Sequence, residues 1–192
     1  ALVCEGQLDV IACHRAGLTQ AVAPQGTSFT KEQADLLKRY TSHVTFAFDA
    51  DEAGQKAAFR SVEVAFTAGL NADVVLLPEG EDPDGLYRSG GAAALKETVK
   101  HTREAFQFLL DYATGQYNDD TAQGRQAVVE QVLAIVAQIP GPVIRSTYCQ
   151  WLSHRVGVDE AAIFESLRRI MRRERRRRRP PEPLAWRPGR PR

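Results

Sequence analysis

Short apolar segments alternate with helical patterns over the first 80 residues of the chain. The apolar segments are 2–4, 21–23, 44–48 and 74–77. The helical patterns between them are 9–16, a segment that starts at a capping box of Thr30 and Gln33, and 52–68. Parallel strands need a crossover connection, usually a helix, so this alternation is typical of a parallel sheet covered by helices. We therefore predict an α/β domain over residues 1–100.

From about residue 101 the strand signals stop and the pattern is helical alone. Apolar residues recur at helical spacing in four segments, which begin near Ala105, Val128, Ile144 and Ile163. We expect a small all-α helical subdomain over 101–171. Residues 172–192 are rich in arginine and proline, a composition that does not build a core, so we expect a basic, disordered linker or tail and no fold beyond about Arg173.

The formal net charge of +1 hides an asymmetry along the chain. Residues 168–192 hold 12 arginines and two glutamates, a balance of +10. The other residues hold 13 basic and 22 acidic side chains, a balance of −9. A basic end of this kind either binds polyanions or serves as a solvated linker, and the sequence supports the two interpretations equally.

Composition argues against several classes of protein. No apolar run is long enough to span a bilayer, so no membrane partner is expected. Three cysteines without a CxxC pair and four scattered histidines form no zinc motif, and we expect buried thiols in a reducing cytoplasm. The chain starts with Ala1 directly before an apolar segment, and we expect it to be a piece of a longer protein.

Two carboxylates, Asp49 and Asp51, directly follow the apolar segment 44–48. Side chains two residues apart on an extended chain point the same way. Two carboxylates held close together repel each other unless a cation lies between them. Oxygen ligands of this kind suit a hard divalent ion such as Mg²⁺, so the pair is a candidate metal site.

Further acids follow the other predicted strands. Glu5 comes after segment 2–4, and Asp82 and Asp84 lie in the loop after segment 74–77. Ligands of open α/β sheets bind at the carboxyl ends of the strands, so we expect these three acids to converge with the first pair. Five acids at one edge of a sheet favour one or two bound metal ions.

Taken singly, each acid also has an ordinary structural explanation. Asp and Glu are common at helix starts, where they accept hydrogen bonds from free backbone N–H groups. On this interpretation Asp9 and Asp51 each cap a helix and Asp82 lies in a turn. For Asp9 the capping role is as well supported as a metal role.

The order of these segments resembles the Toprim signature, in a form similar to bacterial DnaG-type primases. The matching segments are Val3-Cys4-Glu5-Gly6, Asp9-Val10-Ile11-Ala12, Leu36 to Tyr40, Phe48 to Gly54, and Leu76 to Asp84. They span residues 2–84, and their order and spacing make the match specific. The helical part is similar to the subdomain that follows Toprim in that family, without a sharp motif.

The resemblance implies a metal site and an activity. It implies Glu5, Asp49 and Asp51 as catalytic residues, these three with Asp82 and Asp84 as ligands of Mg²⁺ or Mn²⁺, and Asp9 as a supporting carboxylate. The implied activity is that of a DNA-directed RNA polymerase of the primase type. Such an enzyme makes short RNA primers from ribonucleoside triphosphates on a single-stranded DNA template, in the bacterial cytoplasm at nucleoid replication forks.

The resemblance also implies parts outside this chain. A zinc module would precede Ala1, and a domain that binds the replicative helicase would follow the tail, so we expect residues 1–192 alone to be weakly active or inactive. Lys38 and Arg39 are candidates for nucleic-acid contact, and a solvated helix face explains them equally simply.

Two alternative functions remain. A Toprim nuclease uses a similar metal and carboxylate site to hydrolyse phosphodiesters. A non-catalytic Toprim module would keep the fold only to dock nucleic acid or a helicase. The second alternative predicts the loss of an acidic ligand, and the sequence retains all of them.

Overall fold

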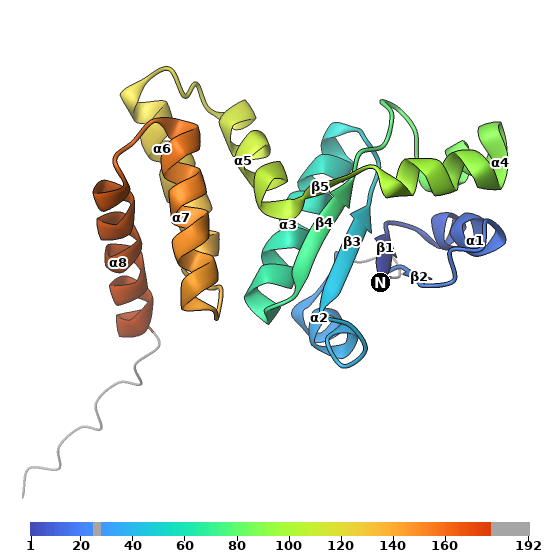
Figure 1. The fold of residues 1–192 in the computed structure, drawn as a ribbon, viewed down its shortest axis with the longest axis horizontal. Coiled ribbons are helices and arrows are strands. Elements are labelled where there is room, and N and C mark those ends of the chain that lie inside the picture. Colours follow the sequence, from blue (N-terminus) through green and yellow to red (C-terminus); the bar gives the residue numbers. More distant parts are fainter. Residues whose placement is uncertain (25–27, 178–192) are drawn as a thin grey trace, which may run out of the picture.

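A computed structural model describes residues 1–24 and 28–177 of the chain. In these residues five strands form one sheet in the order β2-β1-β3-β4-β5 (Figure 1). The strands are β1 (Leu2–Cys4), β2 (Ala21–Val22), β3 (His43–Ala47), β4 (Asn71–Val75) and β5 (Thr102–Glu104). The first four are parallel, and β5 is antiparallel to β4. The predicted α/β fold is confirmed, with one antiparallel edge strand that the sequence analysis did not predict.

Four helices belong to the sheet part of the molecule. They are α1 (Gln7–Arg15), α2 (Lys31–Leu37), α3 (Glu52–Ala68) and α4 (Pro83–Lys100). The predicted capping box is present at α2, where the Thr30 hydroxyl accepts from the Gln33 N–H and the Gln33 side chain accepts from the Thr30 N–H. α4 consists of two helical halves that meet at Gly91, whose backbone φ of +69° is not helical.

Helices cover both faces of the sheet, because successive side chains of a strand point to opposite faces. In β1, Leu2 and Cys4 lie in a small core with residues of α1 and α4. Val3, between them, lies in a larger core that includes residues of α2 and α3. The three cysteines are buried free thiols, as expected.

The second half of the chain is helical. Its helices are α5 (Ala105–Gln116), α6 (Ala122–Val136), α7 (Pro142–Val156) and α8 (Glu160–Arg177). In Figure 1, α6, α7 and α8 lie side by side at the end of the molecule opposite α1 and α4. α5 packs against α3 and so connects this group of helices to the sheet part.

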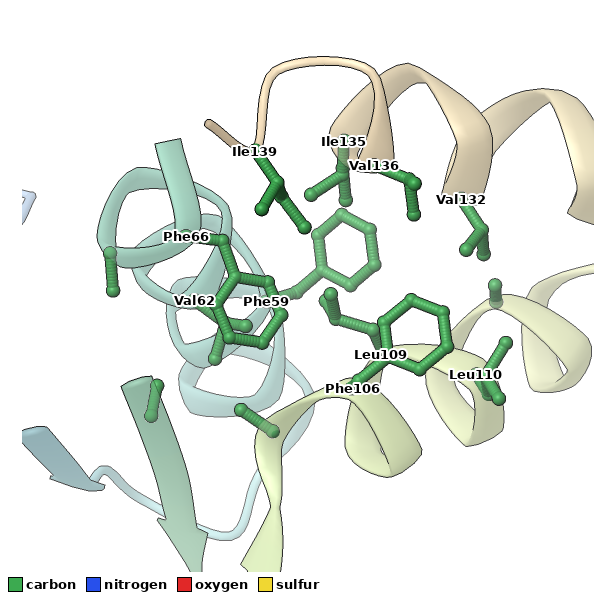
Figure 2. Packing of buried hydrophobic residues seen from close by; sticks show 14 of the residues in the cluster. Phe59, Val62, Phe66, Phe106, Leu109, Leu110, Val132, Ile135, Val136 and Ile139 are labelled. Carbon is green, nitrogen blue, oxygen red and sulfur yellow. The ribbon is translucent and has the colours of Figure 1, made fainter. Parts of the chain in front are cut away.

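One hydrophobic core runs through both parts. Figure 2 shows Phe59 and Phe66 of α3 near Phe106 of α5, with Ile135 of α6 and the neighbouring Ile139 above them. Phe106 is fully buried. Whether residues 1–100 and 101–171 form separate domains remains a prediction, but their side chains share this core.

α8 continues past the expected end of the fold. Its last residue is Arg177, four residues beyond Arg173, because the helical backbone persists into the arginine run. Residues 178–192, on which most of the predicted tail falls, lie outside the described residues, as do residues 25–27. No helix in the described part of the chain is long and apolar enough to cross a membrane.

Candidate metal-binding site

Asp49 leaves β3 at the carboxyl end of the sheet and lies against the start of α3. The chain turns so tightly here that a Cβ on Gly54 would lie 2.2 Å from the carbonyl oxygen of Asp49. Real Cβ atoms do not approach backbone oxygen so closely, so only glycine fits in the first turn of α3. This explains the spacing of the two aspartates from Gly54 in the sequence.

The carboxylate of Asp49 is half-buried and surrounded by other acids. Burial is the largest cause that raises its pKa, to about 6, and the charges of Glu5, Asp9, Asp82 and Asp51 add to it in that order. These charges come from segments that follow β1, β3 and β4. The structure therefore brings four of the five predicted metal ligands, and Asp9, within electrostatic range of one another.

Glu5 follows β1 directly and is largely exposed. Partial desolvation is the first cause that raises the pKa of its carboxyl group, and the charges of Asp51 and Asp9 raise it further. A backbone hydrogen bond at Asp49 acts in the opposite direction. This contact links the end of β1 to the end of β3, so Glu5 belongs to the same cluster.

Asp9 is more central than the sequence analysis predicted. Its side chain is only 7% exposed, and it accepts the backbone N–H of Gly6 at 2.9 Å and that of Asp84 at 3.3 Å. Burial raises the pKa of its carboxyl group, and the charges of Asp82 and Asp84 raise it further. Asp9 thus connects the start of α1 to the start of α4, 75 residues away, and α1 begins at Gln7 instead of at Asp9.

Asp51 and Asp82 are helix caps as well as members of the cluster. The Asp51 carboxylate accepts the backbone N–H of Gly54 at the start of α3, at 2.7 Å. The Asp82 carboxylate does the same for Gly85 at the start of α4. Since each carboxylate has two oxygens, a cap leaves one oxygen for another partner. The structural and the functional interpretation of these residues are therefore compatible.

Asp84 has a partner that the sequence analysis missed. Its carboxylate pairs with the Arg88 guanidinium at 3.0 Å, one turn further along α4. Asp84 is not among the charges that raise the pKa of Asp49. The i, i+4 spacing of Asp84 and Arg88 indicates an ion pair only on a helix, and the sequence pattern predicted a loop at Asp84.

Lys38 and Arg39 are not near the acids. The Lys38 ammonium group donates to the carbonyl oxygen of Ala68 at 2.5 Å, at the carboxyl end of α3. This is the edge of the sheet at which β3 begins, whereas Asp49 lies at the edge at which β3 ends. A role of this pair in nucleic-acid contact stays a prediction.

A groove of about 480 Å³ opens beside Asp49, between the ends of β3 and β4 and helix α5. Arg103, Phe108 and Tyr112 line its far side. Arg103 also pairs with Asp111. These side chains come from β5 and α5, and no pattern in the sequence connects them with the acids.

The cluster fits a hard divalent cation by its donor chemistry. All its side chains offer carboxylate oxygen. Burial first, and then the repulsion of the other acids, raises the pKa of Asp49, and a cation would relieve that repulsion. Over residues 1–24 and 28–177, no three acids, histidines or cysteines are grouped tightly enough to enclose an ion. Several of the oxygens are instead engaged by backbone N–H groups.

Two sequence families match the chain. The Toprim-like family matches residues 2–87, and the family described as the DnaB-helicase binding domain of primase matches residues 106–161. The fold and the acid cluster therefore define a Toprim-like α/β domain followed by a helical region. The chain belongs to the DnaG-type primases, of which it is the Toprim and helical part. A Toprim domain of a primase implies a divalent metal ion.

Known relatives support this assignment over most of the chain. A DNA primase of Clostridium acetobutylicum is 32% identical over 85% of this chain and 27% of its own length. The structure of a DNA primase domain from Pseudomonas aeruginosa is 29% identical, with a TM-score of 0.77 over 89% of this chain and 53% of that one. The structure of a DnaG primase catalytic domain bound to ssDNA is 33% identical, with a TM-score of 0.75 over 84% of this chain and 52% of that one. The chain thus spans less than a third of the length of the Clostridium acetobutylicum primase.

Proposed function

We propose that this chain carries the nucleotidyl-transfer site of a DNA primase that makes short RNA primers on single-stranded DNA. The observation that supports the proposal most directly is the convergence of Glu5, Asp49 and Asp51 at the carboxyl end of a parallel sheet. Burial raises the pKa of Asp49 to about 6, with the charges of Glu5 and the other neighbouring acids as further causes. Residues 1–100 would form the catalytic domain, 101–171 the helical subdomain and 172–192 a linker.

Each acid has a separate role in the proposal. Glu5, Asp49, Asp51, Asp82 and Asp84 would hold the metal, and Asp9 would support them by accepting the backbone N–H of Asp84. Mg²⁺ is the proposed ion, with Mn²⁺ as a substitute. When bound, such an ion would neutralise phosphate charge and stabilise the leaving pyrophosphate.

Glu5 is also proposed to act as a general base. The primer 3′-hydroxyl attacks the α-phosphate of a ribonucleoside triphosphate, the new oxygen–phosphorus bond forms, and pyrophosphate leaves. The Glu5 carboxylate accepts the proton released from that hydroxyl. Its raised pKa, caused first by desolvation, makes it a better base than a free carboxylate in water.

The proposed partners follow from the two matched families and the relatives. They are a single-stranded DNA template, ribonucleoside triphosphates and the growing RNA primer. A replicative helicase is proposed to contact residues 106–161, in addition to the domain expected after the tail. A zinc module would belong to an upstream segment. The complete protein would act at replication forks on the bacterial nucleoid.

Primer synthesis by the full-length protein tests the proposal. The assay uses single-stranded DNA and ribonucleotides, with Mg²⁺ or Mn²⁺, and compares Asp49→Asn and Asp51→Asn with the exposed control Asp120→Asn. The first two variants should lose at least about 100-fold in rate, since each removes a charge that the metal needs. The control should keep the wild-type rate. Full activity of Asp49→Asn would refute the proposal.

The nuclease alternative is distinguished by the product. A nuclease would shorten labelled DNA in the same reaction, and a primase extends RNA by one nucleotide at a time. A non-catalytic module would do neither. All the acids of the cluster are present, and the relatives described above are DNA primases, so neither alternative is favoured.

A further inference from the structure

Helix α8 has one apolar side and one strongly basic side. Ile163 and Leu167 are buried against the rest of the helical region. From residue 168 to its end the helix holds seven exposed arginines, which are Arg168, Arg169, Arg172, Arg173, Arg175, Arg176 and Arg177. At 100° per residue, Arg172 and Arg176 point away from the buried side, and Arg168 lies next to them on the same side. We call this surface the basic face of α8.

The charges of the basic face repel one another. Arg168, Arg172 and Arg176 follow at i, i+4 spacing, at which like charges destabilise a helix. Glu165 is the acid on this side of the helix, and it pairs with Arg169 at 3.3 Å. Among the described residues no other ion pair involves an arginine of α8. A polyanion bound along the face would relieve this repulsion, so the surface is arranged for a partner with several negative charges.

We propose that the basic face of α8 binds the phosphodiester backbone of DNA as a second contact, remote from the acid cluster. DNA as the partner rests on the proposed function. A membrane surface fits less well, because an interfacial helix must insert its apolar side into lipid, and that side of α8 is already buried in the protein. Apart from Glu165, the charged side chains on the outward side are arginines, which bind phosphate by charge and by paired hydrogen bonds.

The dimensions of the face suit a short stretch of strand. From residue 168 to residue 177 the helix rises about 13 Å, close to the distance that four phosphates of one strand cover along the axis of a duplex, at about 3.4 Å each. In Figure 1, α8 lies at the end of the molecule opposite α1 and α4. Those two helices are joined at the acid cluster by the hydrogen bond between Asp84 and Asp9. DNA held at α8 would therefore lie away from the reacting groups. The contact would serve to retain DNA, and it would need no metal.

Salt-dependent binding of a fluorescent 20-nucleotide single strand by residues 1–192, with EDTA present, tests the proposal. The test variant is Arg168→Gln/Arg172→Gln/Arg176→Gln, in which glutamine preserves helix propensity. Each phosphate contact on a single strand contributes about 0.7 to the slope of log affinity against log salt. The triple variant should therefore lose about 2 in that slope and at least about tenfold in affinity at low salt.

The matched control is Lys31→Gln/Arg60→Gln/Lys100→Gln, which removes three exposed charges from the sheet part. It should change the affinity by less than about threefold. Every protein compared retains residues 178–192, so a difference between the two triples reports on α8. Equal loss in both would mean that net charge alone is responsible, and no loss in the α8 variant would mean that DNA does not use this face. Either result overturns the proposal.

Two further measurements complete the test. The thermal unfolding midpoint of the α8 variant should not fall, since the substitutions relieve repulsion, so weak binding cannot be attributed to unfolding. If the variant bound polyglutamate or anionic phosphatidylglycerol vesicles more weakly but DNA normally, the partner would be an acidic protein or a membrane, and the proposal would fail. Asp49→Asn should bind DNA normally in EDTA, so failure of the primase assignment is distinguishable from failure at α8.

Discussion

Asp49 is the residue at which the charges of the cluster meet, and its pKa of about 6 predicts how the metal-free protein responds to pH. A carboxyl group whose folded-state pKa exceeds its ordinary 3.8 keeps its proton better when folded. Its contribution to stability is thus complete below about pH 4 and is lost as the pH rises through 6. Without metal, the unfolding midpoint should fall over this window, and less so in Asp49→Asn.

Added metal should oppose the loss of stability that the metal-free protein shows as the pH rises. Mg²⁺ competes with the proton for Asp49, so it should raise the unfolding midpoint of the wild type at pH 7.5 more than at pH 5. Asp49→Asn should show little increase at either pH. Differential scanning fluorimetry with and without EDTA measures both effects. An increase at pH 5 equal to that at pH 7.5 would contradict this prediction.

Gly54 limits the geometry of the same turn. Gly54→Ala would place a methyl group 2.2 Å from the Asp49 carbonyl oxygen, so the chain must shift, at a cost of about 3 kcal/mol of unfolding free energy. The control Gly115→Ala, in α5, meets no atom within 4 Å and should be neutral or stabilising by up to about 1 kcal/mol. Urea denaturation compares the two. Equal stability of the two variants would show that the turn is not constrained.

At the scale of elements, helices with clear caps and apolar periodicity were predicted from the sequence. Elements that form only through tertiary contacts were not. α2 and α3 were predicted because caps and apolar periodicity mark their ends. β5 was missed because Thr102, Arg103 and Glu104 carry no apolar alternation, and the strand exists through its pairing with β4. The first half of α4 was missed because its glycines favour a loop, although Asp82 caps it.

The same distinction holds for the site. Acids at strand ends were predictable because parallel strands bring their carboxyl ends to one edge. The central place of Asp9 was not, since it depends on a contact with Asp84 across 75 residues. Arg103 is likewise near the cluster only because β5 pairs with β4 and α5 follows it. Sequence patterns predict which side chains lie at the end of a strand, and tertiary packing decides which other residues lie next to them.

The junction of β5 and α5 is fixed to α7 by one polar contact. Glu104 caps α5 by accepting the Gln107 N–H at 3.0 Å, and it accepts the Tyr148 hydroxyl at 3.1 Å. Burial raises the pKa of Glu104, and the hydrogen bond from Tyr148 opposes that shift. Tyr148→Phe should therefore raise the pKa of Glu104 further and cost about 1 kcal/mol of unfolding free energy. Tyr40→Phe, at an 82% exposed site, is the matched control. Urea denaturation at several pH values measures both effects, and identical curves for the two variants would contradict the assignment.

At the scale of the molecule, the shared core makes the two halves dependent on each other. Phe106, from the helical half, is stacked on Tyr148 with ring centroids 3.9 Å apart and belongs to the same cluster as Phe59 and Phe66 of α3. Cutting the chain near residue 104 would expose this surface on both pieces. We therefore expect the sheet part and the helical part to unfold in one transition, although they match separate sequence families.

Phe106→Ala tests this coupling. Loss of a fully buried phenylalanine side chain should cost about 4 kcal/mol of unfolding free energy. Phe164→Ala, at a half-buried position on α8, should cost less. Hydrogen exchange measured by mass spectrometry should show α3 and α6 losing protection to the same extent in Phe106→Ala, since both helices line the core that the ring fills. Loss confined to α6, with α3 unchanged, would mean that the helical part opens alone and that the acid cluster is stable without it.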